Sequence, residues 1–232
     1  MCIVWAEVKN MNKTHEPVLN VIDAFFAKYT RLQYKKGEVV LRAGDPPAGV
    51  LYLKKGFVRM SFIAQNGEML VLHVFKSGSF FPMAWVVNDA PNRYYFEALT
   101  PVELWRAPRE DVDKVMREHP EILEDFTSRI LMGLSGVLER MEHLVFETAY
   151  NKTILLLLYY AKNFSDAKKK GILTIPLTHK EIAAWIGTTR ETASIQIELL
   201  KQKKLILYER RYIIIPDLAK LEKEVATLPH EK

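Results

Sequence analysis

Residues 177–202 constrain the fold of this chain most strongly, because they predict two short helices joined by a tight turn at Gly187. Two capping boxes mark the helix starts, and they consist of Thr178 with Glu181 and of Thr188 with Glu191. In each box a threonine hydroxyl and a glutamate carboxylate bind amide groups that the first helical turn leaves free. The segment therefore predicts a compact helical pair.

Each predicted helix has an apolar stripe, formed by Ile182, Ala183 and Ile186 on the first and by Ala193, Ile197 and Leu200 on the second. The outer face of the second helix presents Arg190, Glu191, Ser194 and Ile195. This pattern is typical of a helix-turn-helix, whose second helix enters the DNA major groove. The alternative is an ordinary helical hairpin with a solvated face.

A short hairpin follows the helical pair. The apolar runs 205–208 and 212–215 predict two strands, with a polar turn at 209–211 and a stop at Pro216. A basic tip beside a helix-turn-helix can reach the phosphate backbone. The residues expected to contact DNA are Thr178, Thr188, Thr189, Arg190, Glu191, Ser194, Ile195, Arg210 and Arg211.

The distribution of charge supports a DNA-binding C-terminal half. The whole chain has 33 Lys and Arg against 28 Asp and Glu, for a formal charge of +5. Residues 151–232 contain 15 basic and 9 acidic residues, so the basic surplus lies in the half with the helix-turn-helix. Such a surplus is the electrostatic footprint of a nucleic-acid-binding domain.

Length and composition exclude several other classes of protein. The 232 residues suffice for one large or two modest domains. No apolar run is long enough to span a membrane and no signal peptide is evident, so we expect a cytoplasmic protein. The sole cysteine, Cys2, excludes an intramolecular disulfide and multi-cysteine metal sites, and the histidines lack metal-ligand spacing. We therefore expect neither a cofactor nor a bound metal.

The first half of the chain predicts a small β-barrel or roll. Residues 17–30 have a mixed helical pattern, and short β-branched and aromatic runs alternate with glycine turns from about residue 31 to residue 108. The strongest hairpin signal is Asn66-Gly67, between the runs 58–63 and 69–75.

A long helix is predicted from about Pro120 to Glu147, followed by a hinge at 146–151 and a second helix at 151–164. Its apolar residues are spaced by three and four positions, and they are Ile130, Leu134, Val137, Met141 and Leu144. Such a seam favours a two-fold partner helix, because paired recognition helices match two-fold DNA sites. The alternative is a helix that packs only on its own roll. The expected division is 17–118, 119–150 and 151–232.

These parts occur in an order that resembles the cyclic-AMP receptor protein / fumarate-nitrate reductase regulator (CRP/FNR) family of bacterial transcription factors. The similarity covers roughly residues 20–220, and residues 186–194 look like the recognition-helix signature of that family. Supporting motifs are Lys36-Gly-Glu38, Gly44-Asp-Pro46, 53–58, Gly78-Ser-Phe-Phe81 and 98–104. The resemblance implies an α+β fold: an N-terminal jelly-roll sensor domain like a cyclic-nucleotide-binding domain, a dimerisation helix and a C-terminal winged helix-turn-helix.

The chain departs from the cyclic-nucleotide binders of that family. Their Gly-Glu pair reads Pro82-Met83 here, their Arg-Ser pair reads Arg93-Tyr94, and the polar pair on the long helix reads Val137-Leu138. The haem-binding members use a cysteine and a histidine near this turn, where Pro82 and Ala84 stand, and the oxygen sensors need several cysteines. The resemblance therefore argues against cyclic AMP, haem and iron–sulfur clusters.

The expected effector pocket consists of Phe80, Phe81, Met83, Arg93, Tyr94, Val137, Leu138 and Met141. Two interpretations remain open. The pocket binds an apolar or aromatic effector that Arg93 or a tyrosine hydroxyl orients, or its own side chains fill it.

The function that the resemblance implies is transcription regulation, with a homodimer on a pseudo-palindromic promoter site and RNA polymerase as a further partner. No nucleophile elbow or phosphate loop is present, so we do not expect an enzyme. The alternatives are a sensing or dimerisation module without DNA binding and a metal-dependent β-barrel enzyme, which needs clustered histidines.

Overall fold

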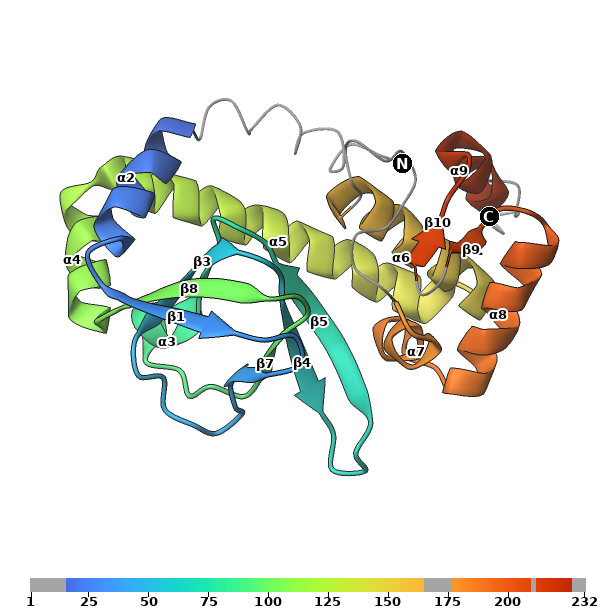
Figure 1. The fold of residues 1–232 in the computed structure, drawn as a ribbon, viewed down its shortest axis with the longest axis horizontal. Helices are drawn as coiled ribbons and strands as arrows, with labels where there is room; N and C mark the ends of the chain where they lie inside the picture. The colour runs from blue at the N-terminus through green and yellow to red at the C-terminus, as the bar shows by residue number, and fades with distance from the viewer. Residues whose placement is uncertain (1–15, 165–176, 210–211, 227–232) are drawn as a thin grey trace. The chain divides into compact units, whose positions relative to one another are not determined.

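The computed structural model describes residues 16–164, 177–209 and 212–226 of the chain (Figure 1). Contacts within the chain define two compact units. The first comprises residues up to 63 together with 72–139, and the second comprises 64–71 together with the residues from 140 onward.

The first unit contains the predicted roll, which is built from two four-stranded sheets. One sheet has the order β1 (Thr30–Tyr34), β8 (Val102–Ala107), β3 (Val50–Lys55) and β6 (Phe80–Phe81). The other has the order β2 (Val39–Leu41), β7 (Tyr95–Ala98), β4 (Val58–Ile63) and β5 (Met69–Phe75). Leucines of β3 and β8 and aromatic residues of β6 and β7 share one core cluster, so the sheets pack face to face.

The hairpin predicted at Asn66-Gly67 is confirmed, because it joins β4 and β5, which are neighbours in their sheet. Gly67 has a φ of +82°, a backbone conformation that glycine adopts without steric cost. The amide of Ala64 donates to the carbonyl of Glu68 at 2.8 Å, and the amide of Glu68 donates to Oδ1 of Asn66 at 3.1 Å. The turn residues thus set the register of both strands.

Three helices cover the outer face of the sheet that contains β3 (Figure 1). They are α2 (Glu16–Phe26), α4 (Arg109–Glu118) and the first turns of α5 (Pro120–Phe146). The hydroxyl of Tyr52 on β3 donates to Asp23 of α2 at 2.6 Å, which attaches that helix to the sheet. The helix predicted for 17–30 is shorter than expected, because Thr30 already pairs with Arg106 in β1.

The short helix α3 (Met83–Asn88) interrupts the β-rich region and was not predicted. It ends at Asp89, which has a φ of +54° and donates its amide to the carbonyl of Trp85 at 3.1 Å. Arg109 of α4 also contacts α3 and donates to the carbonyl of Val86 at 3.1 Å.

The second unit contains the last turns of α5, the four helices α6 (Ala149–Phe164), α7 (His179–Ile186), α8 (Arg190–Gln202) and α9 (Leu218–Ala226), and the two short strands β9 (Leu207–Glu209) and β10 (Tyr212–Ile214). Helix α6 packs against α7, α8 and α9. Glu224 of α9 accepts hydrogen bonds from the hydroxyl of Tyr150 at 2.9 Å and from Nζ of Lys203 at 2.6 Å. Across the described ranges, no helix combines the length and apolar character that crossing a bilayer requires.

Candidate nucleic-acid interface

Helices α7 and α8 form the predicted helical pair, and Gly187 between them has a φ of +64°. The first capping box is confirmed. The amide of Glu181 donates to Oγ1 of Thr178 at 3.2 Å, and the amide of Thr178 donates to Oε2 of Glu181 at 2.7 Å. The start of α7 is therefore held as the sequence predicts.

The second capping box was predicted wrongly by one residue. Helix α8 begins at Arg190, and its cap is Thr189, whose hydroxyl accepts from the amide of Thr192 at 3.2 Å. Thr188 belongs to the turn, because its amide donates to the carbonyl of Ala183 at 3.1 Å and so completes the end of α7. Because Thr188 is part of the turn, Thr189 occupies the N-cap position of α8.

The two apolar stripes are confirmed, since all six of their residues are buried: Ile182, Ala183, Ile186, Ala193, Ile197 and Leu200. Arg190 and Glu191 are exposed on the first turn of α8. Within the described ranges neither side chain makes a hydrogen bond or an ion pair. Ile195 follows one turn later and is 59 % exposed, so the first half of α8 presents a cation, an anion and an apolar side chain to solvent.

Ser194 differs from these three residues, because its hydroxyl is used within the helical pair. Oγ of Ser194 lies 2.7 Å from Nδ1 of His179, the first residue of α7. Both side chains are half-buried. The hydroxyls of Thr178 and Thr189 are likewise used as helix caps. Of the residues expected to contact DNA, four therefore have side chains that make no hydrogen bond or ion pair in the described ranges, and they are Thr188, Arg190, Glu191 and Ile195.

The hairpin after α8 is present, and Glu209 of β9 pairs with Tyr212 of β10. Arg210 and Arg211, which are expected to contact DNA, lie outside the described part of the chain. The first strand starts later than predicted, at Leu207, because the amide of Leu205 still donates to the carbonyl of Leu200 at the end of α8, at 3.0 Å.

The seam predicted on α5 is apolar and largely exposed in the single chain. Ile130, Leu134, Val137 and Met141 are between 46 and 56 % exposed, whereas Leu144 is half-buried. A Cβ placed on Gly187 would lie 3.7 Å from Cδ2 of Leu144, so this last residue packs beside the turn between α7 and α8. Four of the five seam residues thus leave large apolar side chains in solvent, a feature of protein–protein contact sites.

The residues of the expected effector pocket do not all line one cavity. Phe81 is 1 % exposed and stacks on Phe96 and Phe75, with ring centroids 4.9 and 4.8 Å apart, in the core between the two sheets. Phe80 belongs to the other core, where its ring centroid is 5.3 Å from that of Phe126. Successive residues of a strand point to opposite faces, so β6 sends these two rings into different cores.

The other pocket candidates are more exposed. Arg93 and Tyr94 are exposed in the loop before β7, and Val137 and Leu138 are exposed on α5. Met83 is partly buried against the core that contains Phe80. Asn92, which the sequence reading missed, is buried and holds the loop: its side-chain amide donates to the carbonyls of Arg42 and Tyr94 at 2.6 and 2.9 Å.

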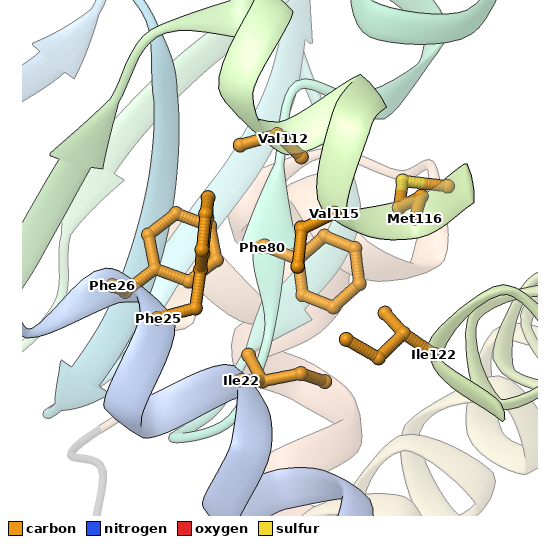
Figure 2. A pocket seen from close by; sticks show the side chains of 8 residues that line it. All are labelled: Ile22, Phe25, Phe26, Phe80, Val112, Val115, Met116 and Ile122. Atoms are coloured by element: carbon orange, nitrogen blue, oxygen red, sulfur yellow. The ribbon is translucent and has the colours of Figure 1, made fainter. Parts of the chain in front are cut away.

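Figure 2 shows a small pocket around Phe80, between α2, α4 and the start of α5. Its lining is wholly apolar and consists of Ile22, Phe25, Phe26, Phe80, Val112, Val115, Met116 and Ile122. These side chains present no polar atom that would orient a ribose or a phosphate.

The chain matches two protein families in succession. Residues 31–119 match the cyclic nucleotide-binding domain, and residues 152–224 match the Crp-like helix-turn-helix domain. The two matches cover the roll and the helical pair.

Proteins of similar sequence are transcription regulators. The transcriptional regulator SdrP of Thermus thermophilus is 30 % identical over 166 residues, which are 70 % of this chain and 78 % of that protein. The global nitrogen regulator of Nostoc sp. is 28 % identical over 189 residues, 78 % of this chain and 83 % of that protein. A solved CRP/FNR-family regulator from Thermus thermophilus is 25 % identical, with a TM-score of 0.72 over 85 % of this chain and 99 % of its own.

Proposed function

Because this chain belongs to the CRP/FNR family of transcription regulators, we propose that it binds a pseudo-palindromic promoter site as a homodimer and reads bases with the first turns of α8. The observation that carries this proposal is the pair of exposed, unengaged charges at Arg190 and Glu191, on a helix whose opposite face is buried. The function is that of a regulator and not of an enzyme.

The chemistry of the exposed face predicts its base preferences. An arginine donates two hydrogen bonds to O6 and N7 of guanine, and a glutamate accepts from N4 of cytosine. Arg190 and Glu191 together therefore suit a G·C pair in each half-site. The exposed Ile195 suits the methyl group of thymine, which is an apolar contact in the same groove. The hydroxyl of Thr188, together with Arg210 and Arg211, is proposed to contact the backbone phosphates, while Thr178 and Thr189 hold the helix starts beside the DNA.

The apolar seam on α5 supports the homodimer. Two copies that pair their seams bury Ile130, Leu134, Val137 and Met141 against each other, which removes these side chains from water. A two-fold pair of helix-turn-helix units matches two half-sites separated by about 34 Å, which is one turn of DNA. Dimerisation therefore accounts for the exposed seam, whereas packing of α5 on its own roll leaves these four side chains in water.

The core of the roll supports the proposal that cyclic AMP is not the effector. The ring stack of Phe75, Phe81 and Phe96 occupies the space between the sheets. Buried polar groups of a ligand cost roughly 1–3 kcal/mol each when they find no partner. An effector of this protein is either apolar or aromatic, or the roll has none. RNA polymerase is the further partner that we propose, since a regulator on promoter DNA acts on the enzyme that transcribes it.

Selection of bound duplexes from a random pool by the purified full chain tests the proposal. We expect enrichment of a two-fold symmetric site with a G·C pair in each half and half-site centres about one helical turn apart. Failure to enrich any sequence, or enrichment of a site without symmetry, would contradict it.

A further inference from the structure

Arg140 of α5 binds both the ring and the backbone of one residue in the helix-turn-helix. Its guanidinium carbon lies 4.5 Å from the ring centroid of Trp185, and Nη2 donates to the carbonyl oxygen of Trp185 at 2.8 Å. Trp185 is 5 % exposed and is the last residue but one of α7. A guanidinium that stacks and donates at once fixes both the position and the orientation of its partner.

The charge of Arg140 suits this place. The last turn of a helix has carbonyl oxygens without intrahelical donors and a partial negative charge. Burial lowers the pKa of Arg140 to about 10, so the guanidinium is still protonated at neutral pH. Arg140 therefore caps the end of α7 with a full positive charge, while the amides of Gly187 and Thr188 both donate to Ala183.

Further contacts join the same end of α5 to its neighbours. Nζ of Lys152 on α6 donates to the carbonyl of Leu144 at 2.8 Å, and the side-chain amide of Asn151 donates to Glu147 at 2.7 Å. Leu144 also packs beside the turn at Gly187. The last turns of α5 are thus attached to α6 and to the helix-turn-helix together, and Arg140 supplies a direct polar contact to α7.

We propose that Arg140 is a positioning residue that holds the helix-turn-helix at a fixed angle to the last turns of α5, and that it thereby sets the half-site spacing that the dimer accepts. This inference rests on the proposed function, in which two copies pair along α5. Met141, next to Arg140, belongs to that seam, so the angle of each recognition helix is set close to the two-fold axis. If the connection between α5 and the helix-turn-helix is stiff, the second recognition helix of the dimer has a high effective concentration at one half-site spacing only. If the connection is loose, a lower effective concentration is distributed over several spacings.

Replacement of Arg140 by methionine in the full chain tests this role. Methionine keeps an unbranched apolar side chain over the Trp185 ring but has neither the charge nor the hydrogen-bond donors. Arg117→Met is the matched control, because it removes an exposed arginine of α4 that bonds to Asp113. Affinity is measured on the selected half-site alone and on two half-sites whose separation is varied by single base pairs.

We expect wild type and Arg117→Met to lose about 100-fold in affinity when the spacing departs from the optimum, because the rigid dimer then reaches only one half-site. Arg140→Met loses about tenfold at the optimum, varies little across the series and keeps its half-site affinity within about twofold. Arg140→Lys keeps a cation over the Trp185 ring but lacks the planar guanidinium. Its spacing preference is expected to lie between that of wild type and that of Arg140→Met.

Three other results would overturn the inference. If Arg140→Met keeps the sharp spacing preference, the function stands and the inference is wrong. If it loses as much affinity for the half-site as for the pair, Arg140 only supports the fold of the helix-turn-helix. If wild type binds none of the duplexes, the proposed function fails and the inference fails with it.

Discussion

Leu134 is the position at which the proposed dimer seam is most directly perturbed. Its side chain is 52 % exposed in the single chain, so about half of it remains to be buried by a partner. Full burial of a leucine is worth about 1.5–3 kcal/mol, and the remaining half is therefore worth about 0.8–1.5 kcal/mol. Because both copies of Leu134 are buried in a two-fold interface, the two side chains together contribute about 1.5–3 kcal/mol to the free energy of dimerisation.

That free energy sets the expected loss. At 1.4 kcal/mol per tenfold, Leu134→Ala should weaken dimerisation about 10- to 100-fold. Leu134→Glu should weaken it further, because each buried and unpaired carboxylate costs several kcal/mol. The same variant should bind the palindromic site poorly while each unit remains folded.

Sedimentation velocity over a range of protein concentrations measures the effect. Val87→Glu is the control, since Val87 is also apolar and is 57 % exposed but lies on α3, away from the seam. We expect that control to sediment as wild type does. A Leu134→Glu protein that still sediments as a dimer would refute the assignment of the seam.

Three further predictions concern other parts of the molecule. Ile195→Arg should move the preferred base from thymine to guanine at one position of each half-site, and a selection that still returns thymine would refute the assigned contact. Isothermal calorimetry should detect no micromolar binding of cyclic AMP, because apolar and aromatic side chains occupy the core of the roll; measurable micromolar binding would show that the polar anchors lie elsewhere. The pKa of Glu224 is lowered mainly by its hydrogen bond from Lys203, so the carboxylate adds stability above the usual glutamate pKa that is lost as the pH falls through the lowered value. Glu224→Gln should therefore lower the melting temperature at pH 7 and approach wild type in acid, and an equal gap at both pH values would contradict this.

The helix-turn-helix and the long helix could be predicted because their signals are local. Capping residues and apolar periodicity act within a few positions, and so the buried stripes and the length of α5 followed from the sequence. The second cap was misplaced because Thr188 and Thr189 are adjacent and chemically alike. The choice between them depends on the bond from Thr188 to Ala183, across the turn.

The roll core and the α5 contact could not be predicted in the same way. Strand β6 has only two residues, too few for an alternating pattern, so the opposite directions of Phe80 and Phe81 were not evident. Arg140 and Trp185 are 45 positions apart, and their contact depends on packing between helices that are remote in sequence. Likewise, the bond from His179 to Ser194 follows from the angle between α7 and α8.

The central claim is that Arg190 reads a base pair, and a cycle of four affinities tests it most directly. Wild type and Arg190→Ala are each titrated with the selected site and with a site in which the G·C pair assigned to Arg190 is replaced by A·T. We expect the base change to cost wild type about 1–3 kcal/mol, since it removes a bidentate contact, and to cost Arg190→Ala almost nothing. If the two proteins discriminate between the sites equally, Arg190 does not read this pair and the proposed mode of recognition is wrong.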